Sequence, residues 1–205
     1  MHNKSKAFII VIIVLAIIIV AMGYITYSII GVERVERSQS YEYNLHVIPD
    51  ENRDFTLYVP IVINEDESVS ELTEDLHITK GNANYEIINT EHGWALKIEG
   101  HEEVIFGSST KERIIFPYLS MLNETIDRRD ALGEVDFWVF CDRPNGNGNI
   151  TLSVQLSTQS ERNWYNGLGM HKWSSGSARE EEIEDVTLTS GWQKSPGYIS
   201  MELSD

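Results

Sequence analysis

An uninterrupted apolar run near the amino terminus constrains this chain more than any other feature. The run extends from Ala7 to Val32 and contains no charged residue. As a helix that rises about 1.5 Å per residue, its 26 residues reach roughly 39 Å, enough to cross a hydrocarbon core of about 30 Å. We therefore predict a transmembrane signal-anchor helix over residues 7–32, which holds the rest of the chain at a cell membrane.

The flanks of this run predict its orientation. Lys4 and Lys6 precede it in a leader of six residues, whereas Arg34 and Arg37 follow it. So short a leader favours an amino terminus that stays inside the cell. We predict a cytoplasmic tail over residues 1–6 and a single-pass topology with the carboxyl-terminal part outside the cytoplasm.

Two other fates of the amino terminus stay open. Ala21-Met22-Gly23 fits the small-x-small pattern of a signal-peptide cleavage site, which would release the chain. Separately, Lys6-Ala7 ahead of the apolar run resembles the cleavage point of archaeal type IV pilin-like precursors. That resemblance implies a filament subunit in which residues 8–31 pack against neighbouring subunits.

The charge of the remaining chain excludes one class of partner. All 32 acidic residues and 14 of the 16 basic residues follow the apolar run, so residues 33–205 carry a net charge of −18. A domain so acidic repels nucleic acid and anionic lipid head groups. We expect neither as a ligand.

The pattern of apolar residues changes after a short stem, which we assign to residues 33–39. Glu33 and Arg37 have the i, i+4 spacing of a helix, which favours a helix that continues one or two turns beyond the membrane. From Ser40 onwards the period is two, since Tyr41, Tyr43, Leu45 and Val47 alternate with polar residues. This alternation is typical of a half-buried strand.

Similar patterns predict strands along the rest of the chain, at 55–59, 83–89, 94–99, 104–108, 135–141, 150–156, 170–173, 183–189 and 198–203. About eight to ten short strands joined by turns predict an antiparallel β-sandwich of the jelly-roll or Ig-like kind, or a related barrel, over residues 40–205. Strand 135–141 is apolar on both faces, which favours a central position, with 150–156 as its hairpin partner. The segment 117–129 lacks alternation and is predicted to hold a short helix.

Aromatic residues near the carboxyl end suggest a binding surface. Flat aromatic rings next to amide side chains are what sugar-binding sandwiches use, and the same rings also pack cores. The candidates lie in a stretch rich in Gly, Asn and Ser: Trp164, Tyr165, Trp173 and Trp192. They predict a surface glycan or a protein as the partner.

The loop over residues 142–149 is a candidate calcium site. Calcium prefers oxygen ligands, which four of its side chains offer: Asp142, Asn145, Asn147 and Asn149. The same Asn- and Gly-rich composition is ordinary for a hairpin connection, and the spacing is not that of an EF-hand. Two sequons also make Asn123 and Asn149 possible glycosylation sites.

No motif in the sequence indicates a catalytic site. Neither a Gly-x-Ser-x-Gly elbow nor a phosphate-binding loop is present, although a pair of carboxylates could still serve an anchored hydrolase. Cys141 is the only cysteine, and its alternation with Phe137 and Val139 predicts a buried thiol, an intermolecular disulfide being the alternative. The leading hypothesis is a non-enzymatic, membrane-anchored module for surface binding or assembly, with the filament subunit and the hydrolase as alternatives.

Overall fold

The computed structural model describes residues 12–25, 34–111, 117–123, 132–143, 149–165 and 172–204. The chain divides into two compact units. One comprises residues 38–160 and 177–204, and the other comprises residues 1–37, 161–176 and 205.

The smaller unit contains a helix over residues 12–25, and every side chain of this helix is exposed. In the part of the chain that the structure describes, no helix has both the length and the apolar character needed to cross a membrane. The predicted span continues beyond this helix at both ends, into residues 7–11 and 26–32, which lie outside the described ranges.

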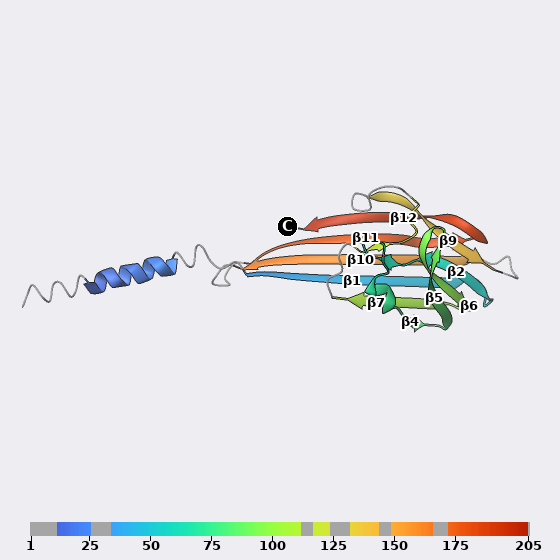
Figure 1. Cartoon of the computed structure of the whole chain (residues 1–205), viewed down its shortest axis with the longest axis horizontal. Coiled ribbons are helices and arrows are strands. Elements are labelled where there is room, and N and C mark those ends of the chain that lie inside the picture. Colours follow the sequence, from blue (N-terminus) through green and yellow to red (C-terminus); the bar gives the residue numbers. More distant parts are fainter. Residues whose placement is uncertain are drawn as a thin grey trace, which may run out of the picture. The chain divides into compact units, whose positions relative to one another are not determined.

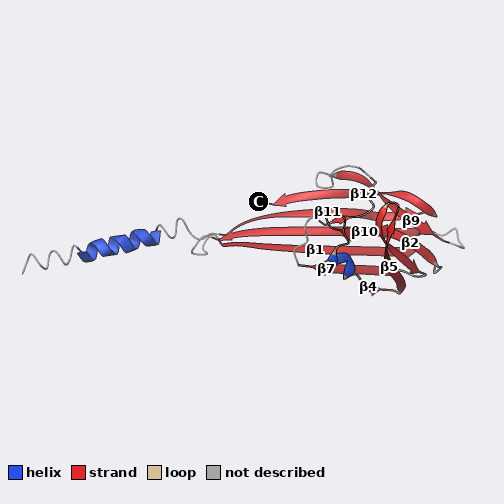
Figure 2. Cartoon of the chain, in the orientation of Figure 1, coloured by secondary structure: helices blue, strands red, loops and turns tan. Residues whose placement is uncertain are grey.

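Strands make up most of the described chain (Figures 1 and 2). They are β1 (Arg34–Pro49), β2 (Phe55–Pro60), β3 (Val62–Ile63), β4 (His77–Lys80), β5 (Ala83–Thr90), β6 (Gly93–Gly100), β7 (Val104–Thr110), β8 (Tyr118–Leu119), β9 (Gly133–Asp142), β10 (Ile150–Tyr165), β11 (Lys172–Leu188) and β12 (Gly191–Ser204). A single helical turn, α2 (Glu71–Glu74), begins after Ser70, whose hydroxyl accepts a hydrogen bond from the Leu72 amide.

Ten of the strands form one sheet, in the order β4-β7-β1-β10-β11-β12-β9-β2-β6-β5, while β3 and β8 pair separately. Its two ends approach each other, because Tyr85 of β5 contacts Phe106 of β7 edge to face at 5.2 Å. The Tyr85 hydroxyl also donates to the carbonyl of Leu76, just before β4, at 2.8 Å. The sheet is therefore nearly closed like a barrel. The prediction of an antiparallel all-β domain is confirmed, in the form of one curled sheet.

The core lies on the inner face of this sheet. Alternate residues of each strand point inward, as β9 illustrates with Phe137, Val139 and Cys141, which are all 0% exposed. Tyr43 reaches from β1 across the core, where its hydroxyl donates to the carbonyl of Pro60 at 2.7 Å. The inner face is thus filled by the apolar residues whose alternation the sequence displays.

Two sequence-based predictions about local structure differ from what the described residues show. The stem does not continue the helix, because β1 begins at Arg34 and is hydrogen-bonded within the sheet between β7 and β10. A single i, i+4 pair contributes only a few tenths of a kcal/mol, which is too little to oppose strand pairing. The expected helix over 117–129 is also absent from its described part, since Tyr118–Leu119 forms β8 and Leu122 bridges to Phe137; residues 124–129 lie outside the described ranges.

Strand pairing also differs from the prediction. β9 is central as expected, but its neighbours are β12 and β2, whereas β10 lies between β1 and β11. β12 matches β9 over nine positions, from Gly191 opposite Cys141 to Ile199 opposite Gly133, which is a longer pairing than a hairpin with 150–156 offers. Likewise, β11 is one strand where the sequence suggested two.

Candidate functional site

An aromatic cluster lies on the outward face of strands β2, β9 and β12. Since residues such as Leu57 and Phe137 point into the core, the residues between them face away from it. The cluster consists of Tyr58, His92, Trp138, Phe140 and Trp192, all of them half-buried. Every member belongs to the larger unit.

The register of the sheet assembles these rings. Tyr58 lies opposite Phe140 in the pairing of β2 with β9, and Phe140 lies opposite Trp192 in the pairing of β9 with β12. Trp138 is the next outward residue of β9. His92 comes from the turn between β5 and β6. Residues far apart in the sequence therefore meet in one row because three strands are aligned.

The rings contact one another in two ways. Tyr58 stacks on Phe140, with ring centroids 4.7 Å apart and planes 25° apart, and His92 stacks on Trp138 at 4.1 Å and 11°. Trp192 meets its neighbours at steep angles instead, at 59° to Tyr58, 55° to Phe140 and 74° to His92. Among the described residues, no ring lies parallel to Trp192. Its indole is thus the ring of the cluster whose faces are not covered by another stacked ring.

Two lysines border the aromatic cluster. Lys194, opposite Trp138 in the register, holds its ammonium nitrogen 5.5 Å from the centroid of the Trp138 ring. Lys97, opposite Tyr58, binds the carboxylates of Glu86 at 2.8 Å and Glu99 at 2.9 Å. Hydrogen bonds to these carboxylates, above all to Glu86, raise the pKa of Lys97. The positive charge of Lys97 is thus balanced by two carboxylates, whereas the ammonium group of Lys194 lies near the Trp138 ring.

Only part of the predicted binding surface falls in this cluster. Trp192 belongs to it, whereas Trp164 lies in the other unit, where the guanidinium carbon of Arg162 is 5.7 Å from its ring centroid. Tyr165 and Trp173 lie in β10 and β11, and their side chains are outside the described part of the structure.

Sequence reasoning missed the remaining members. Trp138 and Phe140 are the apolar residues on the second face of β9, a pattern that by itself predicts a central strand. That interpretation is correct for the strand. The same pattern also indicated an outward aromatic surface, but its partners Tyr58 and Trp192 become neighbours only through the strand register.

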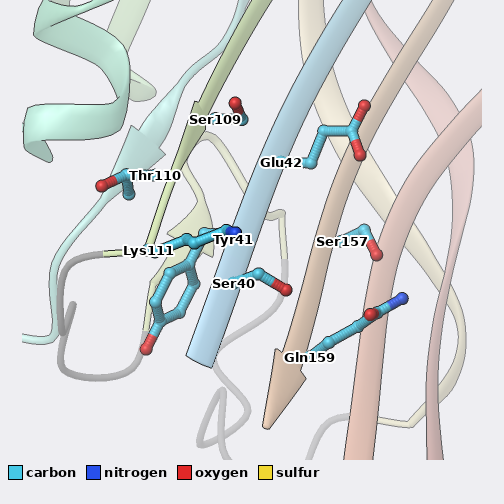
Figure 3. Close-up of a pocket in the computed structure, with 8 residues that line it drawn as sticks. All are labelled: Ser40, Tyr41, Glu42, Ser109, Thr110, Lys111, Ser157 and Gln159. Atoms are coloured by element: carbon cyan, nitrogen blue, oxygen red, sulfur yellow. The ribbon is translucent and has the colours of Figure 1, made fainter. Parts of the chain in front are cut away.

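A second feature of the larger unit is a polar pocket of about 380 Å³ (Figure 3). It lies over adjacent strands β7, β1 and β10 and is lined by Ser40, Tyr41, Glu42, Ser109, Thr110, Lys111, Ser157 and Gln159. In Figure 3, Glu42, Ser157 and Gln159 lie on the β10 side of β1, whereas Ser109 and Thr110 lie on its β7 side. Tyr41 is 2% exposed and belongs to the core, so polar side chains dominate the opening.

The candidate calcium loop is only partly described. Asn145 and Asn147 lie outside the described residues, and Asp142 is exposed at the end of β9. The carbonyl of Asn149 accepts hydrogen bonds from the Asp50 amide at 3.0 Å and from Arg143 at 2.8 Å. Within the described ranges, no three His, Cys, Asp or Glu side chains are grouped closely enough to hold a metal ion.

The two sequon asparagines differ in accessibility. Asn149 is exposed, whereas Asn123 is half-buried, and its backbone amide donates to the carbonyl of Asp136 at 2.8 Å. Cys141 is fully buried, and this burial raises the pKa of its thiol to about 11. The thiol is therefore protonated and shielded at neutral pH, as the alternation in β9 predicted.

Comparison with known proteins adds no relative: the chain matches no family model, no curated protein and no solved structure.

Proposed function

We propose that this chain is a membrane-anchored, extracytoplasmic and non-enzymatic module that binds glycans through its aromatic cluster. The observation that carries the proposal is the geometry of Trp192, whose indole meets three neighbouring rings at 55° to 74° and is stacked by none of them among the described residues.

A sugar ring suits such a surface. Its axial C–H groups form an apolar face that packs on an indole, while its hydroxyls remain at the edge for water or polar side chains. The contacts with Tyr58, Phe140 and His92 restrict the Trp192 side chain before any ligand arrives. A site that is held in place on strands loses less side-chain entropy on binding than a flexible loop does.

The proposed anchor comprises residues 7–32. The helix over residues 12–25 supports it, because its apolar side chains are exposed, with Val20 72% and Ile19 62% exposed. Leaving such surface in water costs about 25 cal/mol per Å², so the helix requires apolar surroundings. A lipid bilayer supplies them. Neighbouring helices of a filament would supply them too, and a mature chain that begins at Ala7 or Phe8 would favour that alternative.

The test uses the full chain in phosphatidylcholine nanodiscs and isothermal titration with hexasaccharides of glucose, mannose and N-acetylglucosamine. We expect at least one of them to bind, and Trp192→Ala to weaken that binding by about tenfold, the loss of one good aromatic contact. Trp164→Ala is the matched control, since it removes an indole outside the cluster, and it should leave the affinity unchanged. An affinity that is unchanged in Trp192→Ala, or no binding by any of the three sugars, would reject the proposal.

A further inference from the structure

The polar pocket on β7, β1 and β10 has side chains whose hydrogen-bonding capacity is not used by the protein. In the described part of the chain, the hydroxyls of Ser40, Ser109 and Ser157 and the side-chain amide of Gln159 form no hydrogen bond to another group. These side chains come from three adjacent strands, and in Figure 3 Ser109 lies on one side of β1 and Ser157 and Gln159 lie on the other.

Other hydroxyls of the same domain are used differently. Ser120 donates to the carbonyl of Trp94 at 2.6 Å, Thr73 donates to the carbonyl of Val62 at 2.9 Å, and Ser153 donates to Asp185 at 2.7 Å. Each of these hydroxyls joins two segments that are well separated in the sequence. The hydroxyls of Ser40, Ser109 and Ser157 make no such bond within the described part of the chain, so they are available to a ligand.

The chemistry of the lining indicates what that ligand is. Serine hydroxyls both donate and accept, and the Gln159 amide offers a donor and an acceptor, which matches a molecule with several hydroxyl groups. Among the described lining residues, the charged ones are Glu42 and Lys111, which have opposite signs and cancel formally. A volume of about 380 Å³ is near the lower end for ligand pockets and suits one sugar ring.

We propose that this pocket is a second binding site, separate from the aromatic cluster, for a neutral polyhydroxylated ligand the size of a monosaccharide. Glu42 accepts hydrogen bonds from ligand hydroxyls and Lys111 donates one, while Ser40, Ser157 and Gln159 complete the contacts from β1 and β10. The pocket holds its ligand by hydrogen bonds, whereas the aromatic cluster uses ring contacts. Binding in the pocket does not depend on the aromatic cluster.

Saturation-transfer NMR on the full chain in phosphatidylcholine nanodiscs tests this, because the method detects weak binding and the lipid adds no sugar. The probes are methyl α-D-glucoside and its tetra-O-methyl derivative, which keeps the ring but lacks hydroxyl donors. We expect transfer to the glucoside and little to the derivative. The double variant Ser157→Ala/Gln159→Ala should raise the dissociation constant of the glucoside by about tenfold.

Two control variants make the outcome decisive. Ser190→Ala, at the exposed turn between β11 and β12, removes a hydroxyl outside the pocket and should change nothing. Trp192→Ala removes any contribution of the aromatic cluster, so the glucoside transfer that remains in this variant reports on the pocket. Equal transfer to both probes, no transfer to either, or an unchanged signal in the double variant would overturn the inference. Loss of the signal in Trp192→Ala alone would reject the pocket and assign the glucoside to the aromatic cluster, so the two proposals fail separately.

Discussion

The aromatic cluster and the polar pocket belong to the same ten-stranded sheet, yet their side chains are used in opposite ways. In the aromatic cluster, on β2, β9 and β12, the rings contact one another at centroid distances of 4.1 to 5.8 Å. In the pocket, on β7, β1 and β10, the hydroxyls of Ser40, Ser109 and Ser157 form no hydrogen bond within the described part of the chain. Mutations in the aromatic cluster should therefore reduce both stability and affinity, whereas mutations in the pocket should reduce affinity alone.

The largest expected effect on stability comes from the core beneath the aromatic cluster, and it sets the scale for the smaller effects below. Phe137→Ala removes a ring that is 0% exposed, and we expect it to lower the free energy of unfolding by about 3–5 kcal/mol. The measurement is chemical denaturation of the full chain in nanodiscs, followed by near-ultraviolet circular dichroism. A loss below about 1 kcal/mol would mean that the inner face is not the packed core described above.

Phe140→Ala should have an intermediate effect. It removes the ring on which Tyr58 stacks and against which Trp192 tilts, so we expect a loss of about 1–2 kcal/mol of stability together with weaker hexasaccharide binding. The same denaturation and titration experiments measure both quantities. If the protein is destabilised but its affinity for the hexasaccharide is unchanged, the rings only pack against each other. The aromatic cluster would then not be a binding site.

Pocket substitutions should scarcely change stability. For Ser157→Ala/Gln159→Ala we expect a change within about 0.5 kcal/mol, since neither side chain is hydrogen-bonded to a described group. Chemical denaturation of this variant and of the wild type measures the change in the free energy of unfolding. A loss above about 1 kcal/mol would indicate that the Ser157 hydroxyl or the Gln159 amide has a structural role, and the contrast with the aromatic cluster would disappear.

The smallest effect concerns an exposed ion-pair network on the pocket side of the sheet. Glu103 binds Lys80 at 2.7 Å and His46 at 2.8 Å, and these hydrogen bonds, that to Lys80 first, lower the pKa of Glu103 from its ordinary 4.5. A lowered folded-state pKa adds stability that is present above pH 4.5 and is lost as the pH falls through the folded value. The free energy of unfolding, measured between neutral and acidic pH, should therefore depend less on pH in Glu103→Gln than in the wild type.

Lys80→Gln provides the matched partner for this test. It removes the strongest cause of the pKa shift without touching the carboxylate, so it should flatten the same part of the pH profile. Profiles identical to that of the wild type in both variants would mean that solvent screens the network completely.

Much of the strand content could be predicted from the sequence because burial on one face imposes a period of two. Tyr41, Tyr43, Leu45 and Val47 predicted β1, and the corresponding pattern predicted the buried position of Cys141 in β9. Pairing could not be predicted, since period two identifies a strand's faces but not its neighbour. Residues 34–39 were misassigned for the same reason: the competing interactions come from strands far away in the sequence.

The aromatic cluster could not be predicted either, because it also depends on strand pairing. Trp192 was recognisable as an aromatic residue in a polar stretch, but so was Trp164, which the structure places in the other unit. What distinguishes the two is the register that brings Tyr58, Phe140 and Trp192 opposite one another. The pocket carried no recognisable signal at all, because single serines on three strands are unremarkable until those strands are adjacent.

Hydroxyl-radical footprinting of the full chain tests whether the aromatic cluster binds glycans. The chain is oxidised with and without a bound hexasaccharide, and the products are read out by mass spectrometry. We predict that the ligand protects Trp192 and Tyr58 from oxidation and leaves the oxidation of Trp164 unchanged. Protection of Trp164 with Trp192 unaffected would contradict it and move the binding surface to the other unit of the chain.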